Sequence, residues 1–266
     1  MKLKPVDSDT KLRLADKDAG RPKRAPSGVE LEAEVDKHTS RISKLQRVLY
    51  ADGRYALLIV LQGRDASGKD GTIRHVFGAV NPQGCEVTGF KAPTDEERAH
   101  DFLWRVHQHV PAHGTIGIFN RSHYEDVLVA RVRKLVPKRI WSKRYDQIND
   151  FERLLAANGV VILKFFLHVS RDEQRRRLSE RLADSTKNWK FRAGDLDDRD
   201  RWNAYTTAYR DALSRCSTPD APWYVVPADD KDVRNWLIAR CIADTLDDLG
   251  LRYPRADASV RNLEID

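Results

Sequence analysis

The chain has 266 residues, of which 41% are hydrophobic and 33% are charged, and its formal net charge is +7. This length is enough for one large domain with a substantial core, or at most two domains. The excess of basic residues favours a polyanionic partner. No run approaches the roughly eighteen apolar residues of a membrane span, and the N-terminal stretch MKLKPVDSDTKLRL has no apolar signal core. Cys85, Cys216 and Cys241 lie far apart, which argues against a disulfide framework and a zinc site. We therefore expect a cytoplasmic protein without a membrane partner.

Residues 1–28 are basic and rich in proline and glycine, which is typical of an extended arm. Ser27 and Glu30 then have the spacing of a capping box. Apolar residues on one helical face follow: Leu31, Val35, Ile42, Leu45 and Leu49. The pattern predicts a helix of roughly six turns. Its apolar stripe suits packing within the subunit or against a second copy.

Beyond this helix, apolar runs alternate with helical patterns. The run YALLIVLQ (55–62) is typical of a strand buried on both faces. Four more strands are predicted over 85–90, 115–120, 160–169 and 222–228. Strands that alternate with helices define an α/β fold with a five-stranded parallel sheet between helices. We assign this domain to residues 29–250 and a C-terminal tail to 251–266.

The segment 171–214 is highly charged for a core layer and predicts a helical lid that projects from the domain. Lids of phosphoryl-transfer enzymes use arginines to stabilise charge on the transferring group. The candidates for phosphate contact are Arg177 and Arg181, one turn apart, and the loop residues Lys187, Lys190 and Arg199. The alternative is an exposed helix with no such contact.

Residues 61–72 read LQGRDASGKDGT, and they place Gly63, Gly68 and Lys69 at the spacing of a phosphate-binding loop. The loop follows a buried strand and opens a helix, so its N–H groups and the helix dipole would attract an anion. We expect the loop to bind phosphate through Gly63, Arg64, Ala66, Ser67, Gly68, Lys69 and Asp70; the alternative is a simple tight turn. Asp70 replaces the hydroxyl residue that usually holds Mg²⁺.

Carboxylates in and after this loop are candidates for the missing metal ligand. Asp65 is expected to hold Mg²⁺, since this ion prefers carboxylate, water and phosphate oxygens. Asp70 would instead complement the helix dipole. The third strand ends at Asn120 and Arg121, where open α/β sheets bind ligands, and Arg121 either contacts substrate or forms a surface salt bridge.

Four blocks in chain order resemble the polyphosphate kinase 2 family. They are GRDASGKDG (63–71), HDFLWR (100–105), FNRSHYEDV (119–127) and APWYVVPA (221–228). The resemblance runs from about residue 30 to 250, and four separate blocks make it far more specific than a phosphate loop alone.

The resemblance implies a phosphate-loop kinase fold with a lid, and reversible, Mg²⁺-dependent transfer from inorganic polyphosphate to nucleotides, with Mn²⁺ as an alternative ion. The expected catalytic residues are Asp65, Lys69, Arg121 and Glu125, with Asp65 and Asp126 at the metal. A basic cluster after Arg121, including Arg131, Arg133 and Lys134, would line a track for the polyphosphate chain. We expect a homo-oligomer, dimer or tetramer, that uses adenine nucleotides, with guanine nucleotides as an alternative.

This chain has Asn120 and Glu125 where several family members have aspartate and asparagine. The version Asn-Arg-Ser-x-Tyr-Glu-Asp resembles the subgroup that phosphorylates monophosphates as well as diphosphates, so we expect AMP and ADP both to be acceptors. Glu125 would hold a magnesium-bound water or a second cation near the acceptor, or else pair with Arg121 and orient it.

Two other functions compete. An ATP-dependent nucleoside or nucleotide kinase would use the same loop, and polyphosphate dependence separates it from the first reading. A basic nucleic-acid-binding protein would show steep salt dependence and would not need Lys69. We expect no nucleic-acid partner, because that reading leaves the glycine loop unexplained.

Overall fold

The computed structural model describes residues 1–7, 12–191, 193–257 and 259. Five strands form one sheet in the order β2-β3-β1-β4-β5, and every paired strand is parallel. Their bounds are β1 Ala56–Gln62, β2 Cys85–Gly89, β3 Ile116–Asn120, β4 Val160–His168 and β5 Trp223–Pro227. The predicted five-stranded parallel sheet is therefore confirmed.

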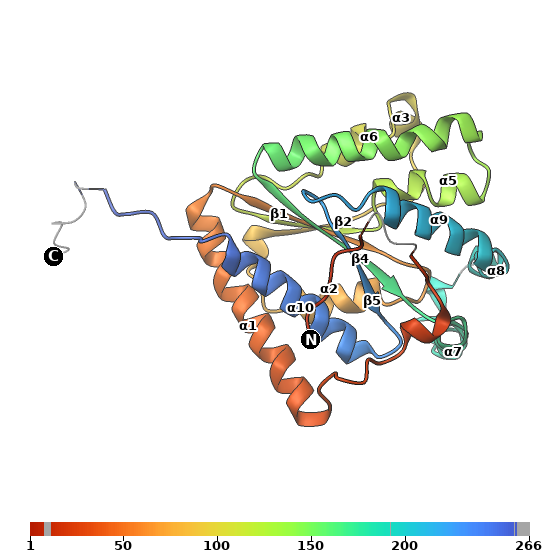
Figure 1. The fold of residues 1–266 in the computed structure, drawn as a ribbon, viewed down its shortest axis with the longest axis horizontal. Helices are drawn as coiled ribbons and strands as arrows, with labels where there is room; N and C mark the ends of the chain where they lie inside the picture. Colours follow the sequence, from red (N-terminus) through yellow and green to blue (C-terminus); the bar gives the residue numbers. More distant parts are fainter. Residues whose placement is uncertain (8–11, 192, 258, 260–266) are drawn as a thin grey trace.

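The central strand β1 is buried along its whole length, and its alternate side chains feed two cores. Leu57, Ile59 and Leu61 face a core shared with α1 (Gly28–Asp52), α2 (Lys69–Phe77) and α10 (Lys231–Asp248). Residues 56, 58 and 60 face a second core with α6 (Lys138–Ala157) and α9 (Trp202–Arg215). Figure 1 shows these two helical layers on opposite sides of the sheet.

Shorter elements complete the chain. The remaining α-helices are α3 Asp95–Ala99, α4 Trp104–His107, α5 Val129–Val132, α7 Arg171–Ala183 and α8 Ala193–Asp200. The short 3₁₀ helices are η1 Asp16–Ala19, η2 Pro82–Gly84, η3 His123–Asp126 and η4 Asn188–Lys190. Two turn residues, Val127 and Leu128, separate η3 from α5.

The expected lid segment has two distinct parts. Its last helix, α9, packs on the sheet, where Ala208, Ala212 and Leu213 are buried in the second core. The charge of residues 171–214 hid this apolar face, because most of that charge lies before α9, whose first eight residues, WNAYTTAY, carry none. Any lid that projects from the domain would be confined to the residues before α9.

The N-terminal arm lies against the sheet rather than away from it. Pro5 forms an antiparallel bridge with Tyr224, and the Val6 N–H donates to the Trp223 carbonyl at 2.7 Å. Further along, the Asp229 N–H donates to Ala19, which is buried. The arm therefore covers the edge strand β5. None of the described helices is both long and apolar enough to cross a membrane.

Candidate active site

The loop between β1 and α2 has the backbone of a phosphate-binding loop. Gly68, the N-cap of α2, has φ +103°, and Ala66 has φ +60°. A Cβ at Gly68 would lie 1.9 Å from Nη1 of Arg234, and one at Gly63 would lie 2.6 Å from the Ser67 hydroxyl. Both glycines are therefore required by close approach, and the turn aims the N-terminus of α2 at the carboxyl end of the sheet.

Lys69 folds back over this loop and is buried. Its Nζ donates to the carbonyls of Gly63 (2.8 Å) and Arg64 (3.2 Å). Burial lowers the pKa of Lys69 to about 8, and the positive charge of Arg121 adds to this shift. An ammonium has three donors, so Lys69 keeps a proton for a phosphate oxygen.

Arg121 connects the end of β3 to the loop. Its backbone has φ +65°, a left-handed conformation that an arginine adopts only when its surroundings impose it. Its guanidinium donates to Asp65 Oδ1 at 2.7 Å and to Glu125 Oε2 at 3.1 Å. The negative charge of Glu125 is the largest cause of the raised pKa of Arg121, and burial opposes it. The guanidinium of Arg121 thus lies between the carboxylates of Asp65 and Glu125 beside the loop, and the three form one chain of ion pairs.

Two amide side chains extend the same arrangement. The Asn120 amide donates to Asp70 Oδ1 at 2.7 Å, so the neutral residue at the end of β3 faces the loop's second carboxylate. The Gln62 amide, oriented so that its nitrogen donates to Glu125 Oε1 (3.1 Å), accepts from the Ser122 N–H at 3.0 Å. Sequence reasoning missed Gln62, although the last residue of a buried strand before a phosphate loop is a place where a polar side chain is informative.

Asp126 lies in a different environment from its neighbour Glu125. Its carboxylate pairs with Arg144 at 2.9 Å and lies 3.8 Å from Arg105. Burial raises the pKa of Asp126, and both arginines oppose that shift. Within the part of the chain that the structure describes, no cluster of three or more His, Cys, Asp or Glu side chains could hold a metal ion.

A narrow cleft opens above the loop. Asp65, Arg121 and Glu125 line it from the sheet side. The facing wall is aromatic and comes from α9, with Trp202, Tyr205 and Tyr209 at helical spacing. That i, i+3, i+7 pattern is the signal that could have revealed this wall from sequence.

Arg64 stacks against the aromatic wall of this cleft. Its guanidinium lies 3.7 Å from the centre of the Trp202 ring and donates to the Thr206 hydroxyl at 2.6 Å. Burial lowers the pKa of Arg64 to about 10. The cation–π contact joins the phosphate loop to α9.

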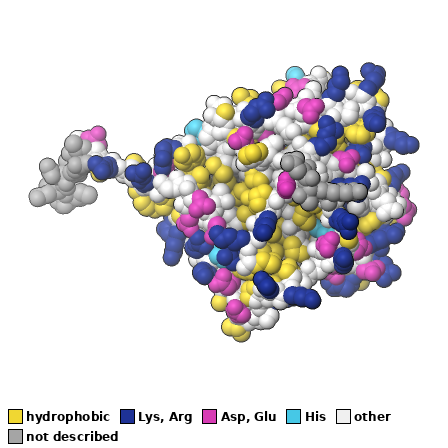
Figure 2. Space-filling view, in the orientation of Figure 1, with side chains coloured by type: hydrophobic (Ala, Val, Ile, Leu, Met, Phe, Trp, Pro, Cys, Tyr) yellow, Lys and Arg dark blue, Asp and Glu magenta, His cyan; other side chains and the backbone are white. Residues whose placement is uncertain are grey.

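The other predicted phosphate-binding residues are spread more widely. Arg131 pairs with Asp211 at 2.7 Å, and Arg133 pairs with Asp198 at 2.8 Å, while Lys134 is exposed. Figure 2 shows Lys and Arg side chains interleaved with Asp and Glu over the face in view. A basic track that used Arg131 and Arg133 would therefore be assembled from residues that already have acidic partners.

In the expected lid, Lys187 pairs with Asp184 at 2.5 Å. Arg199 donates to the Arg171 carbonyl at 2.7 Å and to Gln174 at 3.0 Å. Gln174 in turn donates to the Asp65 carbonyl at 3.0 Å, which links this group of residues to the loop. Arg181 is half-buried, and the Lys190 side chain lies outside the described part of the structure.

A parallel sheet, a glycine loop at a helix N-terminus, a buried loop lysine and an adjacent arginine–carboxylate chain define a phosphate-loop phosphotransferase. Residues 27–252 match the family described as Polyphosphate kinase 2 (PPK2). The chain belongs to this family.

Individual relatives agree with that assignment. The chain is 54% identical to the AMP/ADP-polyphosphate phosphotransferase of Meiothermus ruber, over 85% of each chain. It is 47% identical to the ADP-polyphosphate phosphotransferase of Rhodopseudomonas palustris, over 83% of this chain and 81% of that one. The structure of Polyphosphate Kinase 2 from Arthrobacter aurescens TC1 superposes with a TM-score of 0.88 and 42% identity, covering 95% of this chain and 90% of that one.

Proposed function

We propose that this protein transfers phosphoryl groups from inorganic polyphosphate to adenine nucleotides, with both ADP and AMP as acceptors. The observation that carries the proposal is the Asp65–Arg121–Glu125 chain, which places a cation between two carboxylates beside the buried Lys69. The name of the Meiothermus relative, AMP/ADP-polyphosphate phosphotransferase, supports it.

In the proposed reaction, an oxygen of the acceptor's terminal phosphate forms a bond to the terminal phosphorus of polyphosphate. The bond from that phosphorus to the next bridging oxygen breaks, and a polyphosphate shorter by one unit leaves. Lys69 and the N–H groups of the loop hold the transferring group, while Arg121 neutralises charge that builds up on it. The acceptor phosphate is already ionised, so positioning and electrostatics suffice without a strong general base.

The donor set of this site fits Mg²⁺, since it offers carboxylate oxygens and leaves the remaining positions to water and phosphate. We propose Asp65 as the main ligand, with Asp70 nearby in the loop and Mn²⁺ as an alternative ion. The bound cation would supply charge neutralisation between adjacent phosphates. Asp126 is a weaker candidate, because two arginines, Arg144 and Arg105, surround it, whereas Asp65 has Arg121, which it shares with Glu125.

A coupled assay tests the reaction. The purified chain is incubated with polyphosphate and either AMP or ADP, and nucleotide products are separated by chromatography. Formation of ADP from AMP and ATP from ADP is expected. Phosphorylation that requires ATP and ignores polyphosphate would instead establish the ordinary nucleotide kinase, and salt-sensitive nucleic-acid binding that survives loss of Lys69 would establish the basic binding protein.

Two further expectations belong to this proposal. The three cysteines are free thiols, which supports a cytoplasmic location. A homo-oligomer, dimer or tetramer, is expected and can be measured by light scattering during size-exclusion chromatography.

A further inference from the structure

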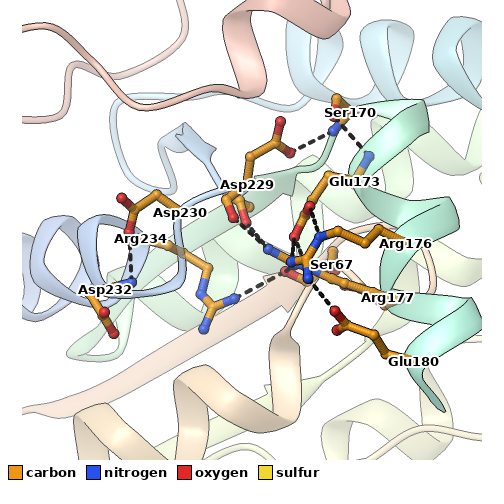
Figure 3. A network of polar contacts seen from close by, with 12 residues as sticks. Ser67, Ser170, Glu173, Arg176, Arg177, Glu180, Asp229, Asp230, Asp232 and Arg234 are labelled. Atoms are coloured by element: carbon orange, nitrogen blue, oxygen red, sulfur yellow. Dashed lines mark hydrogen bonds and ion pairs between the residues drawn. The ribbon is translucent and has the colours of Figure 1, made fainter. Parts of the chain in front are cut away.

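Arg177 of α7 is buried behind the phosphate-binding loop, and all of its hydrogen-bond donors are in use (Figure 3). A guanidinium has five N–H donors. Its Nε donates to Glu173 at 2.7 Å. The four remaining bonds go to backbone carbonyls, those of Ala66 (3.0 Å), Ser67 (3.2 Å), Ala228 (2.7 Å) and Asp229 (2.8 Å). This geometry leaves no donor for a phosphate.

A second buried arginine holds the same point of the loop. Arg234 of α10 donates to the Ser67 carbonyl at 3.3 Å, and Asn235 fixes its guanidinium through bonds of 3.2 and 2.9 Å. Burial lowers the pKa of Arg234 to about 10. The Ser67 carbonyl is therefore held by arginines from two helices that are far apart in the sequence, as Figure 3 shows.

The orientation of that carbonyl determines where the next N–H points. A peptide unit is planar and trans, so its carbonyl and the following N–H point in opposite directions. When the arginines hold the Ser67 carbonyl, the Gly68 N–H is turned to the other side, at the N-terminus of α2 where an anion binds. Arg177 also holds the carbonyl of Ala66, whose φ of +60° persists only under such restraint.

We propose that Arg177 is a positioning residue: it fixes the phosphate-binding loop from behind so that the loop's N–H groups face the transferring phosphate. It does not touch the substrate. Because Arg177 also holds the carbonyls of Ala228 and Asp229, directly after β5, the first half of α7 belongs to the rigid body of the domain. Movement of a lid would then begin beyond this residue. The inference rests on the proposed phosphoryl transfer only for its kinetic readout.

The kinetic test compares Arg177→Lys and Arg177→Gln with the same changes at Arg175, which lies on the same helix with a 70% exposed side chain. Lysine keeps the charge but loses the flat fork that reaches four carbonyls. We expect kcat to fall at least about tenfold in both Arg177 variants, with the KM for ADP within about threefold. The Arg175 variants should match wild type.

Three kinetic outcomes overturn the proposal. If Arg177→Lys restores activity that Arg177→Gln loses, the charge matters and not the geometry. A raised KM for polyphosphate with unchanged kcat would make Arg177 a substrate ligand. If both variants melt at lower temperature yet keep kcat when fully folded, Arg177 serves stability alone.

Hydrogen–deuterium exchange reads the loop without turnover, and so is independent of the proposed reaction. Amides of residues 63–68 should exchange at least about fivefold faster in Arg177→Lys than in Arg175→Lys, because the loop is no longer held. Equal exchange in the two variants would overturn the inference even if the enzyme proved to have another substrate.

If the Arg177 variants do not fold, Glu173→Ala decides. Glu173 orients the Nε of Arg177 and also pairs with Arg176, whereas Glu180 pairs with Arg176 alone among these arginines. Glu180→Ala is therefore the matched control. We expect Glu173→Ala to lower kcat at least about threefold at unchanged KM. Equal kcat in the two variants contradicts the proposal.

Discussion

Two lysines are buried among the residues that the structure describes, and they differ in how many hydrogen-bond partners surround them. Lys164 on β4 lies inside the second core and donates to the Tyr124 hydroxyl (2.7 Å), the Cys216 carbonyl (2.7 Å) and Glu152. Those contacts use its three donors. Lys69 has only two carbonyl partners and no carboxylate within hydrogen-bond distance in the described structure. Each donor of the Lys164 ammonium therefore has a partner, so this lysine is saturated, whereas the Lys69 ammonium has one donor left over and is incomplete.

The comparison separates structure from chemistry. Burial lowers the pKa of both lysines, and for Lys164 the charge of Glu152 opposes the shift. A saturated buried pair gives up nothing to a ligand and serves to hold α6 against β4. An unsaturated buried cation next to an open cleft gains a partner when phosphate arrives, which is what a binding site requires.

Removing the incomplete lysine should affect the reaction most. Lys69→Ala is expected to lower kcat/KM at least about a thousandfold, because it removes a charge aimed at the transferring phosphate. Circular dichroism should show an unchanged fold. Lys44→Ala, at an exposed position of α1, is the control. A rate within tenfold of wild type would mean that the loop does not carry the mechanism.

Removing the saturated lysine, Lys164, should instead lower the free energy of unfolding. Lys164→Met leaves Glu152 buried with only His123 and Tyr124 as partners, which costs about 3–5 kcal/mol of unfolding free energy. Denaturant titration measures the loss, and Lys143→Met, at an exposed position of α6, should change stability little. Equal midpoints for the two variants would show that the Lys164–Glu152 pair does not stabilise the core.

The contrast also shows which parts sequence could predict. The glycine loop is contiguous, and its steric demands on Gly63 and Gly68 are local, so its spacing identified it. The alternation of apolar runs likewise identified the sheet. The two arginines that donate to the Ser67 carbonyl, Arg177 and Arg234, are 110 and 167 positions away in the sequence. Nothing in the charge pattern of α7 distinguishes Arg177, which faces backbone carbonyls, from the exposed Arg175 and Arg176. Such contacts depend on packing.

Asp65, the loop carboxylate that pairs with Arg121, can be tested next. Asp65→Asn keeps the shape of the side chain but removes the charge proposed to hold Mg²⁺, so kcat should fall about thirtyfold and half-maximal activity should need more Mg²⁺. Asp95→Asn, at a 98% exposed carboxylate, is the control. An unchanged Mg²⁺ titration would move the metal site toward Asp126 or Glu125.

The depressed pKa of Lys69 gives a pH dependence. With a pKa of about 8, the free enzyme keeps the ammonium below that pH and loses it above. Only the charged form attracts polyphosphate, so kcat/KM should fall roughly tenfold for each pH unit above 8, while kcat holds to higher pH because bound phosphate favours the proton. Initial rates from pH 7 to 10 measure both. A flat kcat/KM up to pH 10 would contradict the shifted pKa.

Glu125 decides whether the cleft distinguishes the two acceptors. Its Oε2 accepts from Arg121 and its Oε1 lies 3.1 Å from the Gln62 amide, so the orienting role foreseen for it is structurally available. If that were its only role, Asn at this position would weaken use of AMP and ADP alike.

AMP, however, leaves empty the space that the second phosphate of ADP fills, and a carboxylate there can hold a cation or bound water in its place. We expect Glu125→Asn to reduce kcat/KM for AMP at least tenfold more than for ADP, a difference of about 1.4 kcal/mol in transition-state binding. Rates with each acceptor at fixed polyphosphate measure it. Glu86→Gln, at a carboxylate exposed on β2, should leave the ratio unchanged. Equal losses on both acceptors would leave Glu125 as the residue that orients Arg121, and selection of the acceptor would have to come from the aromatic wall of α9.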